Sequence, residues 1–95
     1  MRVLKFPVQP RPGRQKLGPR TEHRLKPVHF ALQYGTPTVW CEEQGEEVGE
    51  HQQFVEVVYT GQSVPRELPV VYVGTLQMNE GDRVLHLYSH VVWEH

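Results

Sequence analysis

Six histidines, one cysteine and eleven acidic residues are the side chains of this 95-residue chain that could bind a metal or support catalysis. His86 and His90 fall on one face of an extended strand, but at about 3.3 Å per residue they stand roughly 13 Å apart, too far to share a metal. Cys41 has no second cysteine with which to bind zinc or form a disulfide. Its neighbours Glu42 and Glu43 disfavour a thiolate nucleophile. The sequence therefore predicts no metal site, no cofactor and no enzyme.

The acidic residues gather in one short segment. Five of them lie within residues 42–50, where Gly45 and Gly49 interrupt the run. Repulsion among the carboxylates and the backbone freedom of glycine both oppose packing. We therefore expect an acidic, solvated loop over residues 42–50.

Two glycine steps offer a candidate ligand loop. Gly74 lies inside an apolar run, and a glycine there indicates a bulge or a close backbone approach, for example by Trp40 or Tyr59. The functional alternative is a concave loop whose hydroxyl, amide and backbone groups bind a small, nucleotide-like ligand. Its residues would be Thr60, Gly61, Gln62, Gly74 and Thr75.

Positive and negative charge occupy different parts of the chain. Residues 1–26 carry eight of the ten Lys and Arg residues and a net charge of +7, whereas residues 27–95 carry a net charge of −8. Prolines and glycines predict that residues 9–24 form an irregular basic arm. Such an arm suits either nucleic-acid phosphates or the acidic 42–50 segment, within one chain or between chains. The contacting residues would be Arg11, Arg14, Lys16 and Arg20. We favour a protein or self contact, because the acidic remainder of the chain would repel a nucleic acid.

Apolar residues recur with a period of two, which predicts strands. A hairpin is expected from Val28–Tyr34 through Gly35 to Thr38–Cys41, and further strands over Phe54–Thr60 and Val70–Leu76. Two more strands are expected over Arg2–Val8 and from Val84 onward, which brings the number of expected strands to about six.

The fold expected from these elements is all-β. A small antiparallel barrel or sandwich, in one domain over residues 1–95, fits the strand count and spacing. No apolar run reaches the length of about 20 residues that a membrane helix needs, and a single cysteine fits a reducing cytoplasm.

The C-terminal strand is a candidate interface. Residues 91–93 extend it with apolar side chains, and an apolar strand at a sheet edge is a template for pairing with another chain. Tyr88, Val92 and Trp93 would contribute to a homodimer contact, because aromatic residues are enriched at interfaces.

Several short motifs follow one another in a recognisable order. They are Gln33-Tyr34-Gly35-Thr36-Pro37-Thr38-Val39-Trp40, Thr60-Gly61-Gln62-Ser63-Val64-Pro65, Tyr72-Val73-Gly74-Thr75 and Leu85-His86-Leu87-Tyr88. In this order the chain resembles a family of short, uncharacterised proteins of bacteriophages and actinobacteria. That family carries Gln-x-Gly-x-Pro-x-Leu-Trp, Thr-Gly-His-x-Val/Ile-Pro, Tyr-Val/Ile-Gly-Thr and Trp-His-x-Phe/Tyr. Gln62 replaces the family's histidine, and seven residues follow Tyr88.

The resemblance implies a compact β domain of phage accessory type, without a known activity. Together with the residue patterns it favours a non-catalytic, self-associating protein-interaction module in the cytoplasm, of the host cell if a phage encodes it. A nucleic-acid-associated protein using the basic arm is the alternative. A binding or sequestering protein for a small ligand is the second alternative.

Overall fold

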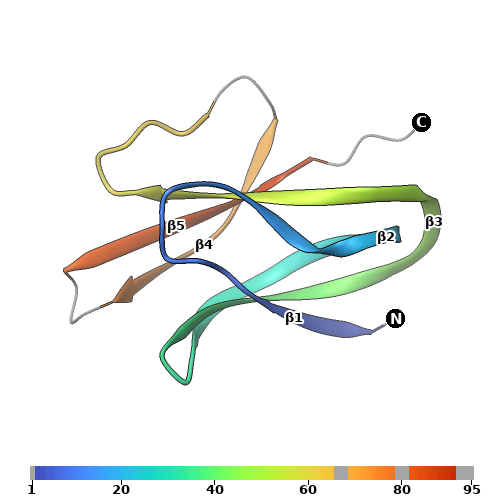
Figure 1. The fold of residues 1–95 in the computed structure, drawn as a ribbon, viewed down its shortest axis with the longest axis horizontal. Coiled ribbons are helices and arrows are strands. Elements are labelled where there is room, and N and C mark those ends of the chain that lie inside the picture. The colour runs from blue at the N-terminus through green and yellow to red at the C-terminus, as the bar shows by residue number, and fades with distance from the viewer. Residues whose placement is uncertain (1, 66–68, 79–81, 92–95) are drawn as a thin grey trace.

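The computed structural model describes residues 2–65, 69–78 and 82–91, which form five strands and no helix. The strands are β1 (Val3–Pro7), β2 (Gly13–Gln33), β3 (Thr36–Tyr59), β4 (Val70–Met78) and β5 (Arg83–His90). All pairings are antiparallel, in the order β1-β3-β5-β4, with β2 also paired to β3 (Figure 1). The prediction of an antiparallel all-β fold is confirmed, and the sheet does not close into a barrel.

Two expected irregular segments are strands. The prediction of an irregular arm over residues 9–24 is wrong from Gly13 onward, because these residues form the first half of β2. The acidic loop predicted over residues 42–50 lies entirely within β3, so two expected strands are the ends of one 24-residue strand. Five strands are therefore observed in place of about six.

Opposite charges across the β2–β3 ladder explain these differences. Arg14 lies opposite Glu56, and its Nε atom is 3.3 Å from the Oε1 atom of Glu56. The Nε atom of Arg20 lies 3.5 Å from the Oε1 atom of Glu50. Cross-strand pairs of opposite charge stabilise a sheet, so each segment supplies the counter-charges that the other lacks.

The long β2–β3 hairpin bends back on itself, so that its two halves lie one above the other (Figure 1). The ladder shifts register at several points between Leu17 and Leu25. Within this stretch Gly18 adopts a φ of +65°, and a Cβ atom placed there would lie 2.8 Å from the Phe6 ring. Glycine is therefore required at the bend, both for its backbone conformation and for the space it leaves.

The bend encloses the hydrophobic core. Core side chains come from both halves of the hairpin, from β4 and β5, and from the residue after β1; they are Val8, Leu17, Leu25, Phe30, Val39, Cys41, Val55, Val57, Leu76, Leu85 and Leu87. The side chains of one strand face alternately into this core and away from it, which is the period of two seen in the sequence.

A buried amide joins the two halves. Gln53, which is paired with Leu17 in one half, accepts a hydrogen bond from the backbone N–H of Leu25 in the other half at 2.7 Å. The Nε2 atom of Gln53 donates to the Leu25 carbonyl oxygen at 2.9 Å. The Gln53 side chain thus satisfies both backbone groups of Leu25, as a neighbouring strand would do.

We expect Gln53→Ala to lower the free energy of unfolding by about 2–4 kcal/mol, because it leaves the buried backbone groups of Leu25 without partners. Urea unfolding followed by circular dichroism measures this change. Gln44→Ala on the same strand is the control, since the Gln44 amide makes one longer bond, 3.3 Å, to the Glu42 carbonyl oxygen. Equal losses in the two variants would contradict the role of Gln53.

Candidate functional site

Two of the basic residues singled out in the sequence are paired with carboxylates of the same chain. Arg11 precedes β2 and is exposed, whereas Arg14, Lys16 and Arg20 lie on β2. The Nε atom of Arg14 lies 3.3 Å from the Oε1 atom of Glu56. With the Arg20–Glu50 pair, two of the four cations therefore contact carboxylates of their own chain. The separation of charge along the sequence is largely cancelled in space, because basic β2 runs beside acidic β3.

Glu56 is the most enclosed of these acids. Its side chain is 7% exposed and contacts Arg14 and the Nε2 atom of His90, the latter at 3.1 Å. The Arg14 guanidinium also lies over the ring of Phe54, 5.8 Å from its centroid. A buried carboxylate needs such partners to offset its desolvation, so this cluster has a structural role.

Two of the ligand-loop candidates, Thr60 and Thr75, meet at His86 of β5. The Nε2 atom of His86 lies 2.9 Å from the Oγ1 atom of Thr60, and the Nδ1 atom of His86 lies 2.9 Å from the Oγ1 atom of Thr75. The hydroxyl of Tyr72 lies 2.6 Å from the same Thr75 oxygen. Four side chains from three segments therefore form one polar chain. The sequence placed His86 on one strand face with His90, and that placement alone did not identify its hydrogen-bond partners.

This polar chain is a weak catalytic arrangement. Thr60 and His86 have the spacing of a hydroxyl and its base. However, the group that orients the imidazole is the Thr75 hydroxyl, whereas a carboxylate would stabilise the imidazolium during proton transfer. The geometry fits hydrogen bonding to a polar ligand better than it fits acyl transfer.

The other loop candidates stabilise the backbone. Gly61 adopts a φ of +94° in the turn after β3, and the Gln62 side chain accepts a hydrogen bond from the Tyr59 N–H at 2.9 Å. Gly74 lies against Phe30, where an added Cβ atom would be 3.2 Å from the Phe30 Cβ atom. The expected close approach is therefore real, but its partner is Phe30 on β2 and not Trp40 or Tyr59.

Cys41 is fully buried in the core. Burial raises the pKa of its thiol from 9.0 to about 12, so the cause is desolvation and not the charge of Glu42 and Glu43. Over residues 2–65, 69–78 and 82–91, no group of three or more His, Cys, Asp or Glu side chains is placed to hold a metal ion. In the same residues no helix is long and apolar enough to cross a membrane.

The expected edge strand is not an edge. β5 pairs with β3 on one side and with β4 on the other, so its backbone is not available to another chain. Tyr88 packs against Tyr72 of β4, with the ring centroids 5.6 Å apart. Val92 and Trp93 lie outside the described residues. Over Arg83–His90 the C-terminal strand therefore offers no free edge, and the interface role of Tyr88, Val92 and Trp93 stays a prediction.

β4 has an edge without a ladder partner, since it pairs only with β5 among the described strands, although it packs on Phe30 of β2 at Gly74. Its nine residues include no charged residue and no proline. Val71 and Tyr72 on it are 58% and 55% exposed. Charges and prolines normally protect a sheet edge from pairing with other chains, and β4 lacks both.

The other two edges do carry that protection. β1 contains Lys5 and Pro7 in its five residues. β2 contains Pro19 and Pro27 together with several Lys and Arg residues, and its register shifts interrupt a regular edge. The contrast makes β4 the best surface for strand pairing in the described chain.

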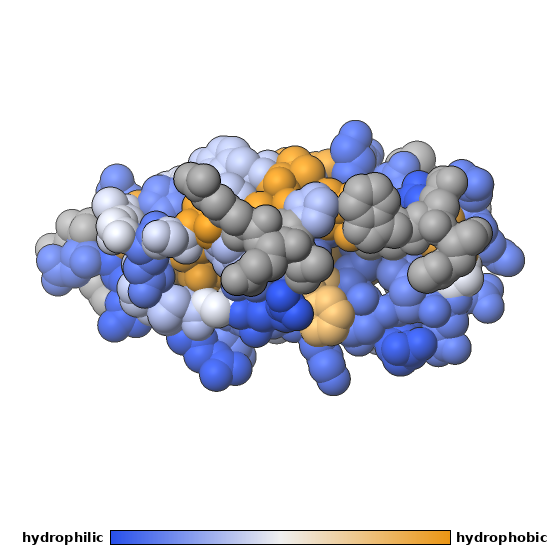
Figure 2. Space-filling view, turned by 90° about the horizontal axis from the view of Figure 1, so that it is seen from above, coloured by the Kyte–Doolittle hydropathy of each residue, from blue (hydrophilic) through white to orange (hydrophobic). Residues whose placement is uncertain are grey.

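Apolar surface lies on the side of the molecule where β4 begins. In Figure 1 the start of β4 is at the top, and Figure 2 looks down onto that side. Figure 2 shows several separate apolar areas on this face, with hydrophilic residues around them. Exposed apolar surface that is rimmed by polar residues is typical of an interaction site.

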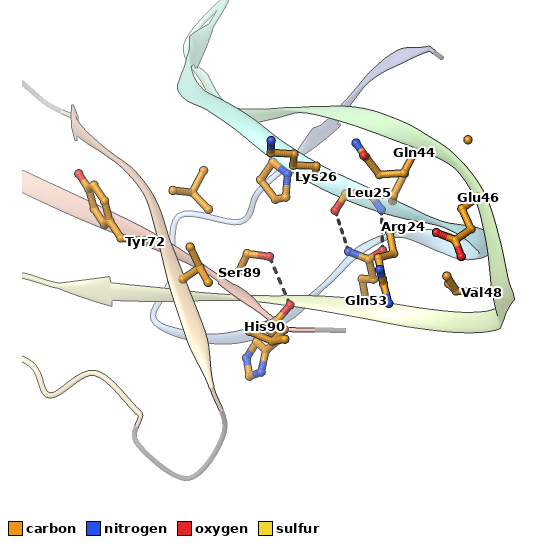
Figure 3. Close-up of a pocket in the computed structure, with 15 residues that line it drawn as sticks. Arg24, Leu25, Lys26, Gln44, Glu46, Val48, Gln53, Tyr72, Ser89 and His90 are labelled. Carbon is orange, nitrogen blue, oxygen red and sulfur yellow. Dashed lines mark hydrogen bonds between the residues drawn. The ribbon is translucent and has the colours of Figure 1, made fainter. Parts of the chain in front are cut away.

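A groove of about 800 Å³ lies beside β4. Near Gly74 the strand packs on β2, and the groove opens between the beginning of β4 and the Arg24–Pro27 part of β2 (Figure 3). Its apolar lining includes Leu25, Pro27, Val48, Val71, Val73 and Val91. No pattern in the sequence marked this groove, because it is formed by the bend of the β2–β3 hairpin.

A family model described as a domain of unknown function (DUF7352) matches residues 1–94, and the chain belongs to this family. No curated protein and no solved structure matches the chain. Family membership assigns no activity, so the functional argument depends on the geometry described above.

We expect the Cys41 thiol to resist alkylation and disulfide exchange at neutral pH in the folded protein, and to react at once in urea. Its raised pKa leaves almost no thiolate, and the sulfur is inaccessible. Ellman's reagent measures the rate. A Cys41→Ala, Ser63→Cys variant is the control, because Ser63 is exposed and a thiol there should react quickly. Equal rates for the two proteins would contradict the buried position of Cys41.

Proposed function

We propose that this member of the DUF7352 family is a non-catalytic interaction module that binds another polypeptide chain at the edge of β4. The observation that carries the proposal is the uncharged, unpaired edge of the nine-residue strand β4. The edges of β1 and β2, in contrast, carry charged residues and prolines. In strand addition, main-chain hydrogen bonds supply affinity and alternate side chains supply specificity. A second copy of the chain is the simplest partner. The homo-oligomer expected from the sequence therefore remains part of the proposal, with β4 in place of the C-terminal strand as the contact.

A cytoplasmic location and a phage accessory role remain part of the proposal. The first is based on the single cysteine and the second on the resemblance of the sequence motifs. Neither depends on the β4 edge.

The alternatives have less support. A nucleic-acid role needs free cations, and Arg14 and Arg20 are paired with carboxylates of the same chain. A small polar ligand is the better second candidate, because Thr60 and Thr75 meet at His86. Thermal stabilisation by a nucleotide, lost in His86→Ala, would favour that candidate, and no stabilisation across a nucleotide and metabolite panel would exclude it.

We expect the wild-type protein to self-associate reversibly across the micromolar range in sedimentation velocity. Val71→Lys and Tyr72→Lys should each weaken association by about tenfold or more, because a lysine on either face of an edge strand opposes pairing. Both side chains are more than half exposed, so the variants should remain folded.

Val3→Lys is the matched control, because Val3 is 64% exposed on the protected edge of β1. Its association should equal that of the wild type. A wild-type protein that remains monomeric throughout, or association that Val3→Lys weakens as much as Val71→Lys, would contradict pairing through β4.

A further inference from the structure

We infer that the groove beside β4 recognises an extended segment of a partner protein in which apolar residues alternate with acidic ones. The inference rests on the proposed function, because the segment would pair with β4 while its side chains enter the groove. It adds the chemistry of the partner, which the edge of β4 alone does not define.

The position of the groove is the first reason. β4 contributes Val71 and Val73 to its lining, so the groove lies directly against the unpaired strand. A chain that adds to β4 would therefore run along the opening. Successive side chains of a strand point to opposite faces, so every second residue of that chain could reach the groove.

The lining sets the requirement for apolar residues. Val71 is exposed, and Val48 and Val73 are partly buried. Leu25 and Gln53 on the inner side are buried and already bonded to each other. Beside these bonded groups the floor offers aliphatic surface, which favours an aliphatic or aromatic side chain over a polar one.

Charge at the rim sets the requirement for acidic residues. Lys26 is exposed on β2, and within the described residues it makes no ion pair, in contrast to Arg2, Arg14 and Arg20. In Figure 3 Lys26 lies between Tyr72 of β4 and the acidic Glu46, which is at the far end of the groove. A carboxylate beside β4 would therefore meet Lys26 before Glu46.

Complementary charge gives such a contact specificity more than affinity. We therefore expect Lys26 to decide which extended segments bind, and the apolar lining to decide how tightly they bind. A second copy of this chain paired through β4 would compete for the same edge.

Fluorescence anisotropy with three labelled peptides tests the inference, at protein concentrations below self-association. The first is Gly-Val-Glu-Val-Tyr-Val-Gly, the second has Lys in place of Glu, and the third has Ser in place of each Val. We expect the acidic peptide to bind, the lysine peptide to bind about fivefold or more weakly, and the serine peptide not to bind.

Variants of the protein complete the test. Lys26→Glu should reverse the order of the acidic and lysine peptides, and Val71→Lys should abolish binding of the acidic peptide. Lys26→Gln should remove the preference without placing a second acid opposite Glu42. Val3→Lys on β1 should behave as the wild type.

The outcomes separate this inference from the proposed function. In one outcome Val71→Lys abolishes peptide binding, but Lys26→Gln and Lys26→Glu leave the preference for the acidic peptide unchanged. That result would overturn recognition by the groove and leave strand addition to β4 intact. Failure of all peptides to bind a protein that self-associates through β4 would overturn this inference alone. Failure of both peptide binding and self-association would overturn both.

Discussion

The contact between the Gln53 side chain and the Leu25 backbone is the constraint on which the rest of the structure depends. Where β2 shifts register, a straight ladder with β3 is impossible, and backbone groups in the enclosed part of the bend need other partners. Gln53 supplies them from the facing half of the hairpin. One sheet can therefore enclose a core by folding over itself, although the chain is too short for a large core. Gly18 also permits the bend, because the absence of a side chain there leaves room for the Phe6 ring.

Much of the fold could be predicted, because an apolar period of two marks segments of several strands. The hairpin around Gly35 and the strands near Phe54, Val70 and Val84 are examples. Residues 13–24 and 42–50 were both predicted to be irregular, for one shared reason. Each segment has a composition that disfavours a strand by itself, and the pairing of one with the other stabilises both as strands. Of the candidate site residues, Thr60 and Thr75 both lie within hydrogen-bond distance of His86, which the sequence did not indicate because the Thr75–His86 contact depends on the pairing of β4 with β5. Sequence reasoning could not find the groove, since strands far apart in the sequence line it.

The same bend explains why one edge remains open. β3 is long enough to pair with β2 along its length and with β1 and β5 at its two ends, which leaves β4 outermost. Gly74 lets β4 approach Phe30 of β2, but no ladder between β4 and β2 closes the sheet among the described strands. The result is an uncharged edge and an adjoining apolar groove on a framework in which Arg2, Arg14 and Arg20 are paired with carboxylates of the same chain. This combination is typical of a surface that recognises another chain.

Nuclear magnetic resonance of the isotopically labelled protein tests the bent hairpin most directly. The account predicts nuclear Overhauser effects between the side-chain amide protons of Gln53 and the backbone of Leu25, together with an amide proton of Leu25 that exchanges as slowly as that of Val39 in the core. An unbent hairpin would give neither. Rapid exchange at Leu25, with Gln53 amide signals typical of a solvent-exposed side chain, would contradict the account and remove the basis for the groove beside β4.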